Sequence, residues 1–458
     1  MHCRIVIFDW YSEKFNFKRI MRRSVNLENL SLLISYIKNI ERVNELGEIV
    51  GKVKEHNRLL MILDVVIEYS ILAIVFFLAL SSTWTTVFLI IGSFAWLIKL
   101  VQDRGRSFRR TPFDKIIACF VTLSALSIFA SPDMGFSFYN FYNLMGRYIF
   151  IYYLVVQNIS TRNQLKCLLS VLLASSLVVV AYGFYQYIYG IDVTSMLWVD
   201  GEQFPELKTR VFSTMQNPNI LAGYLIVMMS LIFGMICKIN AKKAKFLLGI
   251  CFVLMGVCLG MTYCRGAWIS LVTVIAAYGL FHNRKILFGL ALVCVLVLAF
   301  DASIAERLVS VVNISDTSSN MRFALWESTV AMISEHPLLG IGWGSYWMVY
   351  PEYDFFIQND AVKIVHAHNM YLNFAAEIGI AGFLSFMACM VGHLHMALSN
   401  THLKKSNLLN GLTLGAGLSI VCVAINGFTD YVLFNIELSM LFWLVNAMIV
   451  VVCKKELN

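Results

Sequence analysis

The chain has 458 residues, of which 59% are hydrophobic and only 14% are charged. A soluble globular protein has about 45–50% apolar and about 25% charged residues, so this composition excludes an ordinary soluble domain. The formal net charge of +8 does not indicate nucleic acid as a partner. The basic residues stand in short segments between apolar runs, where they act as membrane topology signals.

The first 58 residues are predicted to form a cytoplasmic extension. Residues 15–23 mix aromatic and basic side chains, and residues 30–53 carry apolar side chains at alternating three- and four-residue steps. This spacing is typical of an amphipathic helix, so we expect the extension to rest on membrane lipids. We expect no cleavable signal peptide, because the first long apolar run begins only near Met61.

The remaining residues, 59–458, are predicted to form one polytopic membrane domain. A transmembrane helix needs roughly 17–25 apolar residues, and twelve runs approach or reach this length. These runs are 61–80, 84–100, 113–130, 139–158, 165–189, 218–237, 245–262, 266–281, 286–301, 369–397, 408–428 and 433–452. The sequence therefore predicts an all-α polytopic membrane protein with about 12 transmembrane helices. A large loop, residues 302–368, separates the ninth helix from the tenth.

Basic residues fall in every second loop and at the C-terminus. They lie in the segments 104–110, 162–166, 238–245, 284–285, 404–405 and 454–455. By the positive-inside rule, these segments are cytoplasmic, as are both termini. The segments 190–216 and 302–368 are then predicted to lie outside. The eleven cysteines stand mostly inside apolar runs, and no His/Cys spacing indicates a metal site.

Positive side chains on the predicted outer side need an explanation, because the same rule disfavours them there. They are Lys208, Arg210, Arg265, Arg307, Arg322 and Lys363. Arginine has a planar fork that binds phosphate bidentately, so several arginines in one pocket would suit a pyrophosphate. Near Arg210, Asn217 and Asn219 supply amides at a helix start, where anions are also favoured. Each of these residues also has an explanation that needs no substrate. Arg265 could extend its charged end to the lipid headgroups, Arg322 could be a solvated charge, and Asn217 could be an ordinary helix cap.

Two histidines, His366 and His368, immediately precede the tenth predicted helix. Histidine is the side chain best suited to proton exchange near neutral pH, although a histidine at a membrane interface is more often structural. The neighbouring Asn369 and Glu377 favour a functional site, and which of the two rings acts stays open.

Other conspicuous residues have simpler explanations. Trp326 belongs to an aromatic-rich outer segment that suits either sugar stacking or an aromatic belt at the membrane surface. We expect Arg147 and Asp430 to pair with other buried residues. The glycines of the segment 336–346 are a weak match to a nucleotide loop, because no strand precedes them and no GK[ST] follows.

Four motifs together resemble the O-antigen ligase (WaaL-like) family, whose superfamily includes Wzy-type O-antigen polymerases. In chain order they are RVFSTMQNPNILAGYL, TYCRGAW, RFALWESTVAMISEHPLLGIGWGSY and HNMYLNFAAEIGIAG, and they span Arg210 to Gly382. The order and the predicted side of the membrane agree with that family. A second histidine before the last motif and the 58-residue extension depart from the pattern.

The resemblance implies a GT-C-like membrane glycosyltransferase in the bacterial inner (cytoplasmic) membrane, with its active site extracytoplasmic. The donor would be a glycan on undecaprenyl diphosphate, and the acceptor a hydroxyl of a lipid-anchored core, a glycan or a protein. No metal or cofactor would be required, and the reaction would invert the anomeric carbon. Arg210 and Arg265 would hold the leaving diphosphate, and His368 would deprotonate the acceptor hydroxyl. Arg322, Asn217, Asn219, Trp326, His366, Asn369 and Glu377 would contact substrate, with Glu377 also a candidate to orient His368.

Three alternatives remain at this point. A Wzy-type polymerase would join repeat units with the same motifs, because the acceptor pocket cannot be read from the sequence. A transporter for bicarbonate or another small solute would place ionisable groups near the membrane midplane at broken helices, whereas here they gather at the predicted outer face. A scaffold without catalysis would leave the outer arginines and histidines unexplained.

Overall fold

The computed structural model describes residues 58–190, 210–300, 317–354, 364–402 and 406–453. The chain divides into two compact units, Met1–Ile62 and Leu63–Asn458. Only residues 58–62 of the first unit are described, so the predicted N-terminal extension lies almost entirely outside the described residues. Lys208, Arg307 and Lys363 also lie outside them.

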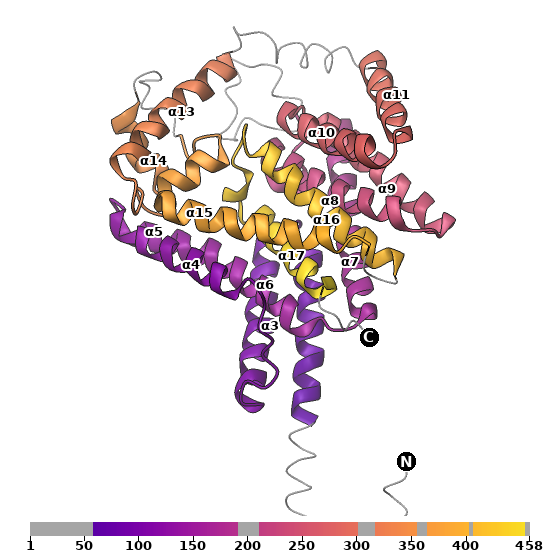
Figure 1. The fold of residues 1–458 in the computed structure, drawn as a ribbon, viewed down its shortest axis with the longest axis horizontal. Helices are drawn as coiled ribbons and strands as arrows, with labels where there is room; N and C mark the ends of the chain where they lie inside the picture. Colours follow the sequence, from indigo (N-terminus) through magenta and orange to yellow (C-terminus); the bar gives the residue numbers. More distant parts are fainter. Residues whose placement is uncertain (1–57, 191–209, 301–316, 355–363, 403–405, 454–458) are drawn as a thin grey trace, which may run out of the picture. The chain divides into compact units, whose positions relative to one another are not determined.

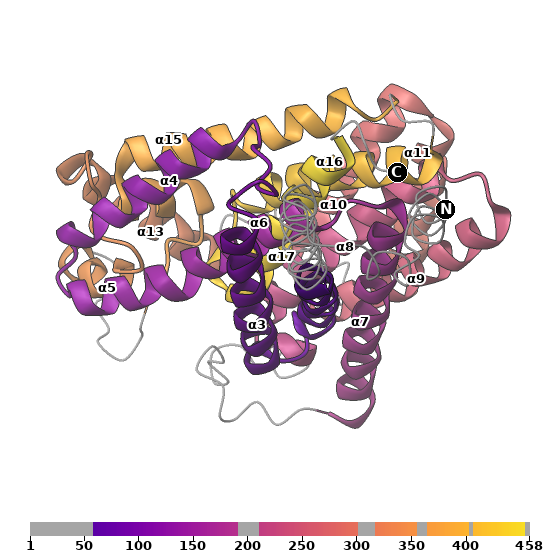
Figure 2. The ribbon, with the colours of Figure 1, turned by 90° about the horizontal axis from the view of Figure 1, so that it is seen from below.

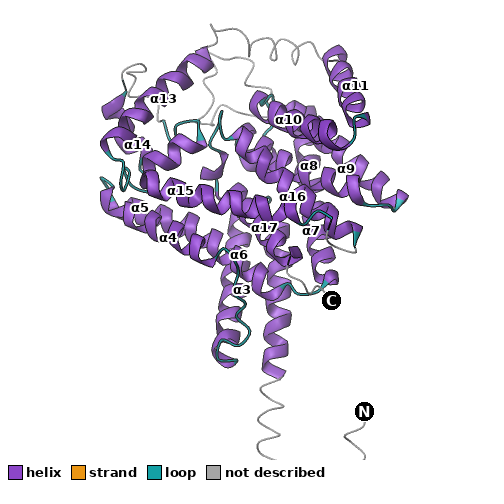
Figure 3. Cartoon of the chain, in the orientation of Figure 1, coloured by secondary structure: helices purple, strands orange, loops and turns teal. Residues whose placement is uncertain are grey.

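The described residues are helical, with no strand among them (Figure 1, Figure 3). The first half contains the helix Arg58–Phe77, α3 (Ser82–Gln102), α4 (Asp114–Ser127), the 3-10 turn η2 (Ile128–Ala130), α5 (Met134–Phe141), the π-helix η3 (Tyr142–Gly146), α6 (Arg147–Asn158) and α7 (Arg162–Tyr189). The middle contains η5 (Ser213–Met215), α8 (Pro218–Lys238), α9 (Lys242–Met261), α10 (Arg265–His282) and α11 (Lys285–Phe300). The last part contains α13 (Thr317–Glu335), α14 (Tyr346–Val349), η6 (Tyr350–Tyr353), α15 (Met370–Ser399), α16 (Asn407–Asn426), η7 (Val432–Phe434) and α17 (Ile436–Cys453).

Among the described helices, eight are long and apolar enough to cross a membrane. The chain is therefore a multi-pass membrane protein. The predicted runs 113–130, 139–158, 266–281 and 286–301 also coincide with helices, but these are not among the eight. Two of them are broken: α4 ends after 14 residues in a 3-10 turn, and α6 has only 12 residues after the π-helix. The presence of twelve transmembrane helices and of a GT-C-like arrangement therefore remains a prediction.

The most deeply buried helices are α8, α16 and α17. In α8 and α17 83% of the spanning window is buried, against 22% in α9, which identifies the first two as central. Glycines allow α8 and α16 to touch backbone to backbone, since a Cβ on Gly234 would lie 2.2 Å from the Gly415 nitrogen. Close approach through small residues is a common way for membrane helices to associate.

The long helix α15 is kinked at Gly379, and the glycine-rich segment 336–346 packs into the kink. Gly379 has φ 70°, inside an otherwise helical stretch. Backbone hydrogen bonds join the two segments, from Ile341 N–H to the Ala376 carbonyl (2.8 Å) and from Ile380 N–H to the Pro337 carbonyl (2.9 Å). Gly340 also adopts a positive φ, and a Cβ there would lie 2.4 Å from the same Ala376 oxygen. These glycines therefore serve close backbone packing.

The described part of the large predicted outer loop has its own small core. Leu325 and Met332 of α13 pack with Tyr346, Tyr350 and Tyr353. Two hydrogen bonds attach this core to the segment around α5: Ser131 and Ser345 hydroxyls lie 2.8 Å apart, and Ser137 donates to the Trp343 carbonyl at 2.7 Å. The loop is thus held against the helices by its own folded structure.

Loops that the topology places on the same side contact one another. On the predicted outer side, Val211 N–H bonds the Met261 carbonyl, and a Cβ on Gly266 would lie 2.5 Å from the Thr429 hydroxyl. On the predicted inner side, the Arg162 guanidinium donates to the Ser406 hydroxyl at 2.7 Å. This grouping agrees with the alternation of loops derived from the basic residues. In both views α15 runs beside α4, with which it packs (Figure 1, Figure 2).

Candidate functional site

The start of α15 holds the histidine motif in a defined conformation. The Asn369 side chain caps the helix by accepting hydrogen bonds from Tyr371 N–H (3.0 Å) and Leu372 N–H (3.1 Å). The residue before the cap, His368, has a left-handed backbone with φ 47°. A non-glycine residue in this region is uncommon, and such residues gather at functional sites when their surroundings hold them in place.

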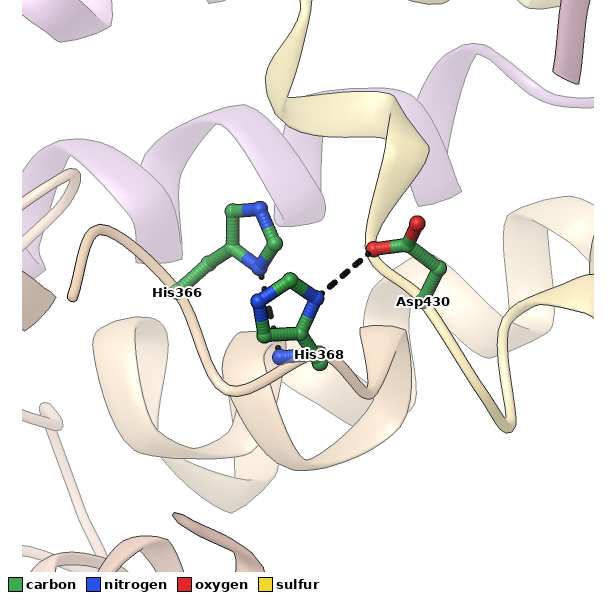
Figure 4. Close-up of side chains that lie close together, drawn as sticks. All are labelled: His366, His368 and Asp430. Atoms are coloured by element: carbon green, nitrogen blue, oxygen red, sulfur yellow. Dashed lines mark hydrogen bonds and ion pairs between the residues drawn. The ribbon is translucent and has the colours of Figure 1, made fainter. Parts of the chain in front are cut away.

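The His368 ring forms an ion-pair-type contact with a carboxylate from a different part of the chain (Figure 4). Its Nδ1 lies 3.2 Å from Oδ1 of Asp430, in the turn between α16 and η7. The same Oδ1 accepts a hydrogen bond from Tyr431 N–H at 2.8 Å. When Nδ1 carries the proton toward Asp430, the lone pair of the ring is on Nε2. This arrangement leaves Nε2 as the nitrogen that can accept a proton.

His366 lies directly beside His368 in the loop, with ring centroids 4.3 Å apart (Figure 4). Its Nδ1 accepts the backbone N–H of His368 at 3.2 Å, which helps to hold the left-handed turn. The ring is only 6% exposed and also packs on Phe434, at 4.5 Å between centroids. His366 is therefore a buried support of the loop, and His368 is the more accessible ring.

Electrostatics keep His366 neutral and Asp430 ionised. Burial, with the neighbouring positive charge of His368, lowers the pKa of His366 to about 3. For Asp430 burial acts to raise the pKa, but the hydrogen bond and charge of His368, with the charge of Arg322, outweigh it and hold the pKa below its ordinary value. The pair is thus a carboxylate facing an imidazole.

Hydrogen bonds hold Arg210 near the N-terminal ends of α8 and α10. Its Nε donates to the Thr262 carbonyl and its Nη2 to Oδ1 of Asn219, both at 2.7 Å. Asn217 caps α8 by accepting the Asn219 N–H at 2.8 Å. The two asparagines therefore hold the helix start and the guanidinium in one rigid unit.

The other two predicted arginines lie in the same neighbourhood. Arg265 begins α10, one residue after the buried Cys264. The positive charges of Arg210 and Arg322 both act on the Cys264 thiol, while burial raises its pKa. Arg322 of α13 also acts on His366 and Asp430. Arg322 therefore acts on both histidine-motif partners and on Cys264, and Arg210 and Arg265 lie near the same cysteine.

Two predicted substrate-binding residues lie farther from the histidine ring. Trp326 packs against the small core of the outer loop, and its Nε1 is buried without a hydrogen-bond partner among the described residues. The Glu377 carboxylate faces the backbone amides of Gly344 and Tyr346. The carboxylate that contacts the His368 ring in the structure is that of Asp430.

The sequence prediction treated Asp430 only as a residue paired with some buried partner. That pairing is confirmed, but its partner is His368, so Asp430 belongs to the candidate site. The topology contained a usable signal, because Asp430 and the histidine motif fall at the same predicted end of the helices. The two residues are 62 positions apart in the chain, so their proximity in space could not be recognised from the sequence.

His366, His368 and Asp430 also offer nitrogen and oxygen atoms within 4.8 Å of one another, a spacing that a metal ion tolerates. Both Nδ1 atoms are already used, one by the His368 backbone N–H and the other by Asp430. The hydrogen bonding therefore suits proton transfer by a carboxylate-supported imidazole. Beside it, the guanidinium groups suit a phosphate-bearing anion.

Part of the chain that includes the histidine motif matches a known protein family. Residues 250–387 match the model of a family described as O-antigen ligase (Wzy_C). The matched range contains Arg265, Arg322, His366, His368 and Glu377. No curated protein sequence matches the chain.

Proposed function

We propose that the chain, whose residues 250–387 match the O-antigen ligase (Wzy_C) family model, is a ligase of that family that transfers a glycan from undecaprenyl diphosphate to an acceptor hydroxyl. The reaction takes place on the outer face of the bacterial inner membrane, and the acceptor is a lipid-anchored core, another glycan or a protein. The observation that carries the proposal is the His368–Asp430 pair, with Nδ1 and Oδ1 3.2 Å apart and with the positive charge of Arg322 acting on the carboxylate.

His368 acts as the general base. Its Nε2 takes the proton of the acceptor hydroxyl as that oxygen attacks the anomeric carbon. Asp430 orients the ring and stabilises the imidazolium that forms, as a carboxylate does beside a catalytic histidine. A base of this kind contributes typically about 10²–10⁴ in rate. A single direct displacement inverts the anomeric carbon, and no metal takes part in it.

Arg210, Arg265 and Arg322 hold the diphosphate of the donor. The bond from the anomeric carbon to the diphosphate oxygen breaks, and negative charge grows on the leaving group. Fixed positive groups then stabilise the transition state more than the ground state. The rigid attachment of Arg210 to Thr262 and Asn219 supports this role, because preorganised donors need no rearrangement during the reaction.

The remaining predicted contacts bind sugars or shape the pocket. Trp326 offers an aromatic face to a sugar ring. His366 and Asn369 hold the loop that carries His368, and Asn217 acts through Asn219 on the position of Arg210. Glu377 accepts sugar hydroxyls beside the glycine-rich segment 336–346.

The proposal is tested by transfer from a purified undecaprenyl-diphosphate glycan, with the full chain in liposomes. Wild type is compared with His368→Ala and Arg265→Ala, and with matched controls on the predicted inner side, His395→Ala and Arg162→Ala. We expect release of undecaprenyl diphosphate by wild type and both controls, and a loss of about 10²–10⁴ in rate for His368→Ala. Equal rates for His368→Ala and wild type would exclude the proposed base.

The ligase is distinguished from a Wzy-type polymerase by the acceptor supplied. One reaction contains a lipid-core acceptor, and a second contains only more donor. Product in the first reaction supports the ligase. Product in the second reaction alone, with chains of increasing length, identifies a polymerase instead.

A further inference from the structure

Arg147 is a charged residue that the proposed reaction does not use. It begins α6, directly after the π-helix η3, and its side chain is half-buried. Its Nη1 donates to the Ser82 hydroxyl at 3.3 Å and its Nη2 to Oδ1 of Asn143 at 3.2 Å. Single π-helical turns occur frequently at functional sites, so the position merits a functional explanation.

Both partners of Arg147 are neutral. Within the described ranges no carboxylate lies at ion-pair distance from it, whereas Lys99 pairs with Asp64. A guanidinium has five N–H donors, and two of these are used. A charge near a membrane that lacks an opposite charge is costly unless a ligand or water completes its environment. The site is therefore suited to receive an anion.

The two partners of Arg147 could also take part in binding an anion. Asn143 donates its own amide N–H to the Tyr139 carbonyl at 2.9 Å, which fixes Oδ1 toward Arg147. The Ser82 hydroxyl accepts from Arg147, so its hydrogen remains able to donate to an oxygen of the ligand. Ser82 is also the first residue of α3, where the helix dipole adds partial positive charge.

Exposed aromatic residues indicate the depth of this site in the membrane. Trp84 on α3 is 53% exposed and Tyr142 in the π-helix is 63% exposed. Trp and Tyr side chains of this kind are enriched at the headgroup level of the bilayer. Arg147 is therefore placed where lipid phosphates are found.

The same segment connects to the candidate active site on two sides. The residue after Arg147, Tyr148, is buried and donates to the Leu433 carbonyl at 3.3 Å, next to the Phe434 ring that packs on His366. The turn before Ser82 accepts a hydrogen bond from the Thr214 hydroxyl at Ala79, in the segment that follows Arg210. Arg147 is thus held by the elements that carry the candidate site, but on a separate helix face.

We propose that Arg147, with Ser82 and Asn143, binds the phosphate of a membrane lipid at the predicted outer ends of α3 and α6. Two lipids offer this chemistry, the headgroup of a bulk anionic phospholipid and the diphosphate of a polyprenyl carrier. The arms of the experiment distinguish these sources. The site does not depend on the transfer reaction itself.

The test measures lipid binding to the purified full chain in detergent by native mass spectrometry. The probes are phosphatidylglycerol, farnesyl diphosphate and neutral phosphatidylcholine. The variants are Arg147→Gln, Arg147→Lys and the control Arg162→Gln, whose guanidinium also bonds a serine hydroxyl. Every variant is made both in wild type and in Arg265→Ala, which separates this site from the proposed diphosphate site.

We expect Arg147→Gln to weaken binding of at least one of the two anionic probes, phosphatidylglycerol and farnesyl diphosphate, by about tenfold in both backgrounds, as loss of a charge-assisted contact would. Arg147→Lys should weaken it less, because the charge remains but the fork is lost. An effect on both probes identifies a headgroup site, and an effect on farnesyl diphosphate alone identifies a carrier site. Unchanged binding of both probes to Arg147→Gln, or an equal loss in Arg162→Gln, overturns the proposal.

Discussion

Gly379 and Leu338 are in such close contact that a Cβ on the glycine would lie 2.1 Å from the Leu338 carbonyl oxygen. The contact occurs at the kink of α15, which separates the turns that follow His368 from the rest of the helix. The glycine-rich segment 336–346, which leads from α13 toward the outer-loop core, packs there. The position of the outer loop relative to the histidine motif is thus tied to one glycine.

Gly379→Ala should therefore destabilise the protein by at least about 2 kcal/mol, because the methyl group meets backbone and the φ of 70° is strained for alanine. Thermal unfolding in detergent measures the change. Gly249→Ala is the control, since a Cβ there has nothing within 4 Å, and it should be neutral or slightly stabilising. Equal melting temperatures for the two variants would contradict the packing argument.

Asp430→Asn should lower kcat by about 10²–10⁴ while the KM for the donor stays nearly unchanged. The amide can no longer stabilise a protonated His368, but it removes no group that holds the diphosphate. Steady-state kinetics with the donor glycan measure the effects on kcat and on KM separately. Asp430→Glu should recover part of the rate, whereas a merely structural role would alter KM, kcat and thermal stability together.

The contribution of His366 to the free energy of unfolding should fall with acidification. Its folded pKa of about 3 lies below the ordinary value of 6.5, so between these values the unfolded chain binds a proton that the folded chain does not. The contribution is fully present above pH 6.5 and is lost as the pH falls toward 3. Each pH unit below 6.5 costs about 1.36 kcal/mol of stability, so the loss at pH 5 is about 2 kcal/mol.

His366→Asn provides the comparison for this pH dependence. Its side-chain oxygen replaces the Nδ1 acceptor, but it does not titrate. Chemical denaturation at pH 7, 6 and 5 should show that the stability of wild type, relative to that of the variant, falls as the pH is lowered. The lowered pKa of Asp430 adds nothing in this range, because that carboxylate contributes stability lost only below its ordinary value of 3.8. Parallel pH profiles for the two proteins would show that His366 does not carry the effect.

Asn219→Ala should weaken donor binding by about tenfold, because it removes a hydrogen bond that anchors Arg210. The effect should appear in KM for the donor, with a smaller fall in kcat. Asn283→Ala, which removes an asparagine from a helix junction on the predicted inner side, is the matched control and should leave both constants unchanged. A normal KM for Asn219→Ala would mean that Arg210 is held adequately without Asn219.

The sequence by itself determined the class of the protein and its candidate chemistry. Apolar runs of membrane length must be helical in lipid, because every backbone polar group needs a partner within its own segment. The helices that the structure describes fall at those runs. Arg210, Arg265, Arg322 and the two histidines stood out because their polar groups are unusual beside apolar helices on that side.

Only the tertiary structure decided which of these groups meet. Hydrophobic periodicity contains no information on contacts between residues far apart in the chain, so the partner of His368 could not be chosen between Glu377 and Asp430. The pairing arises because the buried helices α8, α16 and α17 bring the turn after α16 to the start of α15, where Met370 N–H bonds the Gly427 carbonyl at 2.8 Å. The difference in burial between His366 and His368, on which their proposed roles depend, was likewise decided by the fold. Burial depends on what packs around a ring, and therefore on the whole fold.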